Sequence, residues 1–292
     1  MKKSRLAKVL TLSLAAVMMF SLASCGSGSS SSDSDTSDKD ITVISREEGS
    51  GTRDAFTELT GVLQDDVDRT VDTAEISNST SVVTQSVAGN DAAIGYISLG
   101  SLDDTVKAVK VDGVEASVDN VKSGDYKLQR PFNIVTKGEV GELPQDFINF
   151  IMSSDGQSII EEEGYIAANE NAEEYKASGL EGTITLAGST SVSPVMEVLA
   201  DKYKELNSGV TIEIQQTGSG AGIQSTIEGV CDIGMASRAL EDEEASEGLT
   251  SQEIALDGIA VIVNTENSVE DLSTEQIMNI FIGEITNWAD VK

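Results

Sequence analysis

The sequence predicts an α/β fold with two modest domains and mostly parallel β-sheets. The chain has 292 residues, of which 39% are hydrophobic, and this is enough to build two hydrophobic cores. Short β-branched runs alternate with helical patterns along the chain, which is typical of α/β proteins. In three places a cluster of glycine, serine and threonine joins such a run to the helical pattern that follows it.

The predicted elements of the first half begin at Ile41, directly after a polar stretch. The strands lie at 41–44, 92–97, 106–111, 115–118 and 131–136, and the helices lie at 54–63, 79–88, 145–153 and 156–163. Asp112 and Gly113 separate two of the short strands, because this pair is typical of a turn. Residues 167–181 are polar and are interpreted as a linker.

The second half repeats the same alternation. Its predicted strands lie at 183–187, 210–215, 232–235 and 257–263, and its predicted helices lie at 193–206, 222–228 and 274–281. Cys231 stands beside an apolar strand pattern, so a buried and unreactive thiol is expected there.

The three glycine-containing clusters are candidates for anion binding. They occupy residues 49–52, 188–191 and 218–222. The first turn of a helix offers unpaired N–H groups and a partial positive charge, and serine and threonine add hydroxyl donors. One such cluster is more commonly an ordinary helix cap. Three of the same form predict helix ends that converge on a small tetrahedral oxyanion, and Arg46 and Arg238 lie close to them in sequence.

The composition excludes several classes of function. The net charge is -31, so the surface repels nucleic acid, and any anion site must act through short-range, oriented donors. The chain has no histidine, which excludes histidine metal sites, a Ser-His-Asp triad and a Cys-His pair. Neither an EF-hand spacing nor a phosphate-loop motif is present in the sequence. No metal, cofactor or catalytic residue is therefore expected.

The N-terminus has the form of an export signal. Residues 1–24 combine a basic start with an apolar segment that is short for a membrane span. The segment closes on Leu22-Ala23-Ser24-Cys25-Gly26, which resembles a bacterial lipoprotein cleavage box and implies lipidation of Cys25. The alternative is a plain signal peptide with an incidental cysteine. Residues 25–40 are rich in Ser, Asp and Gly and are interpreted as a disordered tether.

Several motifs taken together resemble one known family. They occupy residues 46–56, 93–96, 130–132, 188–194, 218–222, 232–238, 256–263 and 285–288, and the match spans nearly all of 41–292. The motif Gly188-Ser189-Thr190-Ser191 and the ending Asn287-Trp288 are typical examples. The chain resembles the phosphate-binding proteins of phosphate ABC importers, which have the two-lobed periplasmic-binding-protein fold of type II with a ligand cleft between the lobes.

The order of the motifs departs from that family. There, the Gly-Ser-Thr-Ser motif comes near the mature start, and the motif matched by residues 46–52 follows Asn-Trp. The chain therefore resembles a circularly permuted member, although a truncated or mis-assembled reading frame would give the same order. Permutation implies one lobe assembled from 41–129 and 264–292, which carries Arg46 and Ser50. The other lobe, 130–263, would carry Thr190, Ser219 and the crossover strands.

The resemblance also implies which residues bind phosphate. The second lobe would contribute Ser189, Thr190, Ser191, Ser219, Ser237 and Arg238, and the first lobe would contribute Arg46, Ser50, Gly51 and Thr52. Glu48 matches an acidic position that orients the arginine. Some members have an aspartate in place of Ser237, which accepts the proton of phosphate, so here Glu48 or a backbone carbonyl would have to accept it.

Other residues near these motifs have simpler interpretations. Arg238 has an alternative as a surface ion pair with Glu241 or Asp242. Arg53 is expected to brace its helix or acidic neighbours. Asn78, Ser79 and Thr80 start another helix and are more typical of an ordinary cap than of a fourth rim contact.

The resemblance implies an extracytoplasmic, lipid-anchored and monomeric binding protein at the cell membrane. It would capture inorganic phosphate and deliver it to the membrane permease of an ABC importer, without binding nucleic acid. The alternatives are a binding protein for sulfate or molybdate, or a surface protein that senses phosphate. An enzyme acting on phosphate esters is disfavoured by the missing histidine.

Overall fold

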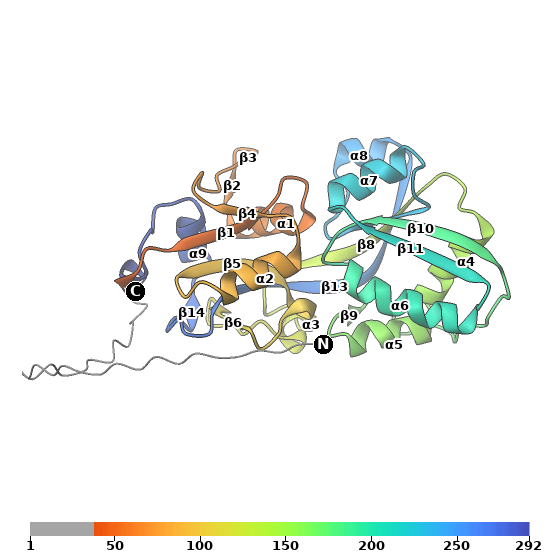
Figure 1. The fold of residues 1–292 in the computed structure, drawn as a ribbon, viewed down its shortest axis with the longest axis horizontal. Helices are drawn as coiled ribbons and strands as arrows, with labels where there is room; N and C mark the ends of the chain where they lie inside the picture. Colours follow the sequence, from red (N-terminus) through yellow and green to blue (C-terminus); the bar gives the residue numbers. More distant parts are fainter. Residues whose placement is uncertain (1–37, 292) are drawn as a thin grey trace, which may run out of the picture. The chain divides into compact units, whose positions relative to one another are not determined.

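Ten strands of the computed structural model join into one mixed β-sheet (Figure 1). The structure describes residues 38–291, so the predicted signal segment, Cys25 and most of the predicted tether lie outside the described residues. The sheet has the order β11-β10-β12-β8-β13-β5-β1-β4, and β6 and β9 pair with β13. Its strands are β1 Thr42–Arg46, β4 Glu75–Ser77, β5 Ala93–Ser98, β6 Val106–Ala108, β8 Gln129–Lys137, β9 Ile166–Ala167, β10 Gly182–Gly188, β11 Val210–Gln216, β12 Ile233–Ala236 and β13 Leu249–Asn264.

Two large hydrophobic cores lie along this sheet and define two lobes, and a third, small cluster consists of Val135, Ile223 and Ala236. The first core draws on residues between Val43 and Leu128, on Ile166 and, from the C-terminal part of the chain, on residues between Ile259 and Trp288. The second core draws on residues between Phe132 and Ala255. We call the parts around these cores the first lobe and the second lobe. The strands β8 and β13 pass between them, and Figure 1 shows both strands crossing from one group of elements to the other.

The helices cover the two cores. Those of the first lobe are α1 Gly51–Thr60, α2 Thr80–Ala88, α3 Val118–Lys122 and α9 Thr274–Phe281; those of the second are α4 Glu142–Ile151, α5 Ser154–Glu162, α6 Ser193–Leu206, α7 Ser219–Ile227 and α8 Asp242–Ser246. The 3-10 turns Leu99–Ser101 and Trp288–Asp290 and short paired strands, β2 Leu63–Gln64 with β3 Val67–Asp68 and β7 Lys110–Val111 with β14 Asp271–Leu272, are further parts of the described chain. No helix within residues 38–291 is long and apolar enough to span a bilayer.

Several predicted elements differ from the structure. The sheet is mixed and not mostly parallel, because β8 and β13 run antiparallel to each other and to their outer neighbours. The predicted strand 115–118 is wrong: Ser117 accepts a hydrogen bond from the Asn120 N–H at 3.3 Å and so begins helix α3. Helix α1 begins three residues earlier than predicted and ends at Gly61, whose left-handed backbone (φ 79) closes it.

The folded chain begins earlier than the predicted end of the tether. Lys39 forms a salt bridge with Asp91, and its carbonyl accepts a hydrogen bond from the Trp288 N–H at 3.0 Å. The Asn287 side chain donates to Asp40 at 3.0 Å. The expectation of a tether up to residue 40 is therefore wrong at its end, because these residues have partners in the C-terminal segment.

A buried ion pair joins the two crossover strands. Arg130 of β8 donates from Nε and Nη2 to Oδ2 of Asp257 on β13, at 3.2 and 3.1 Å, and both side chains are 1% exposed. Asp257 also accepts from the Ser98 hydroxyl at 2.9 Å. Burial raises the pKa of Asp257 to about 6, although Arg130 and Ser98 act in the opposite direction.

This pair predicts a pH dependence of stability. Between about pH 4 and pH 6 the folded protein keeps a proton on Asp257 that the unfolded chain has released, so the free energy of unfolding should fall as the pH rises through this window. Urea unfolding at several pH values would measure it, with Asp257→Asn as the control that cannot titrate. If the free energy of unfolding fell no more steeply with rising pH in the wild-type protein than in Asp257→Asn, the raised pKa would not belong to Asp257.

Candidate binding site between the lobes

The three glycine-containing clusters meet where the two lobes face each other. Thr52 at the start of α1 shares a hydrogen bond with Ser191, Oγ1 to Oγ 2.8 Å, although 139 residues separate them. Ser219 at the start of α7 lies 3.3 Å from Ser237, Oγ to Oγ. The backbone N–H of Gly220 donates to the Gly49 carbonyl at 3.0 Å across the lobes. The predicted convergence of the three helix starts is therefore present in the structure.

The starts of α1 and α7 have backbone N–H groups that lie between the lobes and precede the intrahelical hydrogen bonds. In α1 the first intrahelical bond runs from the Asp54 N–H to the Ser50 carbonyl at 3.0 Å, so the amides of Gly51 and Thr52 precede the helical ladder. Ser50 is the N-cap residue, and its hydroxyl accepts from the Arg53 N–H at 3.4 Å. Helix α7 begins at Ser219, and its first intrahelical bond joins the Gly222 N–H to the Gly218 carbonyl at 3.0 Å.

Gly51 is needed for the close approach of the two lobes. A Cβ atom placed on it would lie 2.5 Å from Oγ of Ser219 and 2.9 Å from Oγ of Ser237. Both distances are shorter than any normal contact, so a side chain at this position would push the start of α1 away from the second lobe.

Arg46 supplies a buried positive charge in the same place. It is the last residue of β1 and is 2% exposed. Its Nη2 donates to the Thr190 hydroxyl at 3.0 Å in the second lobe. Its Nε and Nη2 also donate to the two carboxylate oxygens of Glu47, at 2.9 and 2.8 Å. The residue that orients the arginine is therefore Glu47; the prediction of Glu48 is wrong, because Glu48 lies in the turn after β1 and is exposed.

The backbone of Arg46 is fixed by the core beneath it. Its N–H donates to the Tyr96 hydroxyl at 3.1 Å, which also shares a 2.8 Å hydrogen bond with Ser45. The Tyr96 ring stacks on Phe56 of α1, with ring centres 3.9 Å apart. The Arg46 carbonyl accepts from Nη1 of Arg53 at 2.8 Å, while Nε of Arg53 binds Asp68, so Arg53 braces this region as expected.

A fourth helix start contributes a residue that was not among the predicted site residues. Ser79 caps α2 and accepts from the Val82 N–H at 3.3 Å, as the cap interpretation expects. Thr80, however, lies 3.3 Å from Thr190 and 3.2 Å from Ser191, hydroxyl to hydroxyl, and accepts from Nη1 of Arg46 at 3.4 Å. The helix-start pattern was visible in the sequence, but nothing local distinguishes a rim contact from a cap.

Ser189 and Ser237 fix the loops of the second lobe. The Ser189 hydroxyl accepts from the N–H groups of Ser191 and Val192, at 3.2 and 3.3 Å, and donates to the Ser237 hydroxyl at 3.0 Å. The Ser237 N–H donates to the Ser219 hydroxyl at 3.1 Å. These contacts connect the loop before α6 to the start of α7.

Arg238 lies outside this group of hydroxyls. Its Nε donates to Asp54 at 3.0 Å, and its Nη1 and Nη2 donate to Glu244 at 2.7 and 2.8 Å. Glu241 is 3.4 Å from Nη2. Burial alone would lower the pKa of Arg238, but these carboxylates raise it. The Arg238 guanidinium therefore binds carboxylates, as the alternative of an ion pair with Glu241 expects. Two further partners, Asp54 and Glu244, were not indicated by the sequence.

The group of hydroxyls suits an oxyanion. We call it the hydroxyl cluster: Arg46, Ser50, Gly51, Thr52, Thr80, Ser189, Thr190, Ser191, Ser219 and Ser237, all of which are buried. Hydroxyls, helix-start amides and one guanidinium can surround negative charge with short-range donors. Within residues 38–291 no group of three or more Asp, Glu, Cys or His side chains could hold a metal ion.

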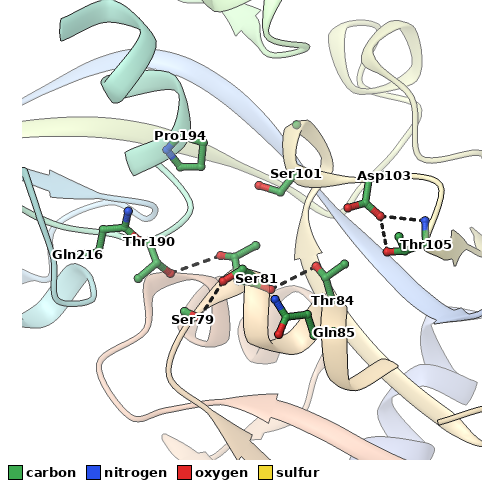
Figure 2. A pocket seen from close by; sticks show the side chains of 12 residues that line it. Ser79, Ser81, Thr84, Gln85, Ser101, Asp103, Thr105, Thr190, Pro194 and Gln216 are labelled. Carbon is green, nitrogen blue, oxygen red and sulfur yellow. Dashed lines mark hydrogen bonds between the residues drawn. The ribbon is translucent and has the colours of Figure 1, made fainter. Parts of the chain in front are cut away.

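A pocket of about 580 Å³ adjoins the hydroxyl cluster and shares Thr80 and Thr190 with it. Figure 2 shows Thr190, Pro194 and Gln216 on one side of it and Ser79, Thr84 and Gln85 on another. Asp103 also lines it, and hydrogen bonds from Thr105 lower the pKa of that carboxyl, so it carries a negative charge. An anion is therefore better accommodated by the cluster than by the pocket.

Comparison with known proteins identifies the family. A family model described as "PBP superfamily domain" matches residues 29–155 and 173–292. The phosphate-binding protein PstS 2 of Streptococcus agalactiae serotype V is 48% identical over 297 residues, which span all of this chain and 99% of that protein. The phosphate-binding protein PstS of Bacillus subtilis is 33% identical over 120 residues, 40% of this chain and 39% of that protein.

A solved structure agrees with these sequence matches. The phosphate-binding protein of a phosphate ABC transporter from Streptococcus pneumoniae superposes with a TM-score of 0.71 at 50% identity, covering 87% of this chain and all of that chain. The chain therefore belongs to the PBP superfamily, in its family of PstS-like phosphate-binding proteins.

Proposed function

We propose that this protein binds inorganic phosphate outside the cytoplasm and supplies it to a phosphate ABC importer. The family is a class of solute-binding proteins without catalytic activity. The observation that carries the proposal is the meeting of four helix starts and one buried arginine between the lobes. Relatives that are 48% and 50% identical over most or all of the chain carry the name phosphate-binding protein, which supports phosphate as the anion.

The hydroxyl cluster can exchange its internal hydrogen bonds for bonds to the ligand. Thr52, Thr80, Thr190 and Ser191 are bonded mainly to one another, and either partner of each pair can donate. A hydroxyl can rotate its proton from its partner toward an anion, and the partner hydroxyl can then donate its own proton to the same anion. Arg46 would add a charge-assisted contact in surroundings from which water is excluded.

Binding between the lobes would favour their closed arrangement. Donors of the first lobe come from β1, α1 and α2, and donors of the second come from the starts of α6 and α7. A phosphate that contacts both sets gains more in the closed arrangement than in an open one, so it shifts the population toward closure. The closed form is the state that we expect the permease to recognise.

Glu47 is the candidate acceptor for the proton of phosphate. Within the described residues it is the carboxylate that binds Arg46, and it lies beside the start of α7, 3.5 Å from a Cβ position built on Gly218. Both of its oxygens receive hydrogen bonds from Arg46, but a carboxylate oxygen can accept more than one. Sulfate is fully ionised at neutral pH and has no O–H group, so it could not donate a hydrogen bond to the Glu47 carboxylate.

Calorimetry with phosphate and sulfate tests the proposal. Phosphate should bind at neutral pH, and sulfate should bind more weakly by about 1–3 kcal/mol, or about 5- to 150-fold, because it leaves a buried acceptor unpaired. Thr105→Val, in the adjoining pocket, is a control that should bind phosphate as the wild-type protein does. If sulfate bound as tightly as phosphate, the site would be a general oxyanion site, and absence of binding by either anion would refute the proposal.

The anchor and the order of the lobes belong to the same proposal. We infer that Cys25 carries the lipid and that residues 26–37 keep the lobes near the permease, since the sequence before Cys25 has the form of a lipoprotein signal.

We also infer a circular permutation. In support, the Ile41 N–H donates to the Thr286 carbonyl at 2.8 Å, so the two ends of the folded chain are neighbours. A permuted order would also explain an alignment to Bacillus subtilis PstS that covers only 40% of the chain.

A further inference from the structure

A salt bridge joins the two lobes next to the hydroxyl cluster without being part of it. Arg238 directly follows Ser237 of the cluster, and Asp54 directly follows Arg53 in the first turn of α1. Their side chains meet at 3.0 Å, Nε to Oδ2, across 184 residues of sequence. We propose that this interlobe salt bridge holds the lobes closed, so that Arg238 sets the rate of ligand release without contacting the ligand. The part that concerns release rests on the proposed function.

The second lobe presents Arg238 in a fixed orientation. Both Nη atoms are bound by Glu244 on α8, at 2.7 and 2.8 Å. Glu244 also accepts from the Glu241 N–H at 2.9 Å, in the capping box that begins this helix. The Arg238 side chain is 11% exposed, and its Nε points to Asp54 of the first lobe. Because its conformation is already fixed, contact with Asp54 costs little further side-chain entropy.

The approach of Asp54 to the second lobe depends on the positive charge of Arg238, because the other charges nearby are mostly negative. Helix α8 carries Asp242, Glu243 and Glu244 in its first turn, and the whole chain has a net charge of -31. Burial raises the pKa of Asp54, and the nearby Glu241 raises it further, while Arg238 lowers it. Without Arg238, closure would bring the Asp54 carboxylate toward an acidic helix, and the lobes would repel each other there.

A second contact lies at the same edge of the interface. The Gly220 N–H donates to the Gly49 carbonyl at 3.0 Å, and a Cβ on Gly220 would lie 3.5 Å from Gly49. Gly49 lies in the connection from β1 to α1, and Asp54 follows it in the first turn of α1. Thr80 and Thr190 of the cluster border the pocket of Figure 2, which Arg238 and Asp54 do not line. The salt bridge thus reinforces the side where the lobes are already in backbone contact.

The test is the phosphate dissociation rate of Arg238→Gln, Asp54→Asn and the double variant, measured by stopped-flow fluorescence. Each single variant should raise the rate about 3- to 30-fold, and the double variant should be no faster than Arg238→Gln alone, because both remove the same contact. Glu241→Gln is the matched control: it also pairs with Arg238, but from the same lobe, at 3.4 Å and with 64% exposure. Its rate should stay within about 2-fold of the wild-type rate.

Two results would overturn the inference. If Arg238→Gln accelerated release while Asp54→Asn did not, Arg238 would be acting on the ligand itself. If neither variant changed the rate, the salt bridge would have no role in closure.

A measurement without ligand separates this inference from the proposed function. Small-angle X-ray scattering of the unliganded proteins should give a larger radius of gyration for Arg238→Gln and Asp54→Asn than for the wild type and Glu241→Gln. If the wild type failed to bind phosphate, the proposed function would fail, and this comparison would still decide the role of the salt bridge. Equal radii in all four proteins would refute it.

Discussion

Replacing Arg46 by alanine should weaken phosphate binding by about 2–5 kcal/mol, or about 30- to 5,000-fold. The guanidinium is 2% exposed and points from β1 to Thr190 of the opposite lobe, so the variant would lose a charge-assisted contact in a buried place. The variant would also leave the Glu47 carboxylate without its ion-pair partner Arg46. Titration calorimetry with inorganic phosphate would measure the loss.

Arg46→Lys is the matched comparison for this variant. It keeps the charge but loses the planar fork that binds Glu47 and Thr190 together, so its affinity should lie between those of the wild type and the alanine variant. The fold should persist in both, since the backbone at this position is held by Tyr96 and Arg53. Unchanged phosphate affinity in a folded Arg46→Ala protein would remove the arginine from the site.

Replacing Phe281 by alanine should lower the free energy of unfolding by about 3–5 kcal/mol. Phe281 is at the end of α9 and is fully buried in the first core. Its ring lies 4.6 Å from Phe56 and 5.6 Å from Tyr96, centre to centre, and both partners come from the N-terminal part of the chain. Because Tyr96 holds the backbone of Arg46, phosphate affinity should fall as well.

Urea unfolding would measure this loss, and Val230→Ala is a suitable control. Val230 is 67% exposed, so its truncation should change stability by no more than about 0.5 kcal/mol. A Phe281→Ala protein with wild-type stability would show that the C-terminal helix is dispensable for the first lobe. That result would also remove the physical basis for proposing a lobe built from both ends of the chain.

Local signals were sufficient for much of the fold. The bounds of α6 and α9 are confirmed as predicted, and each helix has its own start signal: Pro194 in the first turn of α6, and a capping box of Ser273 and Gln276 in α9. The three glycine-containing clusters likewise have a local form, a strand followed by a helix start. One such cluster would have indicated only a helix cap, and the repetition of the form in three places predicted that the clusters meet.

Features that depend on distant partners could not be predicted. The first half of β13 contains Thr250, Ser251, Gln252 and Glu253, an exposed polar run that has no strand pattern of its own. It is a strand because it pairs with β8, and this partner lies more than 100 residues earlier. Pairing of this kind overrides local propensity.

The same limit applies to individual site residues. Glu47 and Glu48 are adjacent and chemically identical, and only the turn after β1 decides which of them reaches Arg46. Thr80 has the sequence of an ordinary first-turn residue, and its contacts to Thr190 and Ser191 exist only because the lobes face each other. The Asp54 partner of Arg238 is likewise set by the approach of α1 to the second lobe.

A crystal structure of the protein with inorganic phosphate tests the central claim most directly. The account predicts phosphate between the lobes, within hydrogen-bonding distance of the Arg46 guanidinium, of the amides at the start of α1, and of the Thr190 and Ser219 hydroxyls. The hydroxyl pairs Thr52–Ser191 and Thr80–Thr190 should then be separated by ligand oxygens. Phosphate bound in the pocket beside Asp103, with Arg46 still bonded to Thr190 as it is here, would contradict the account.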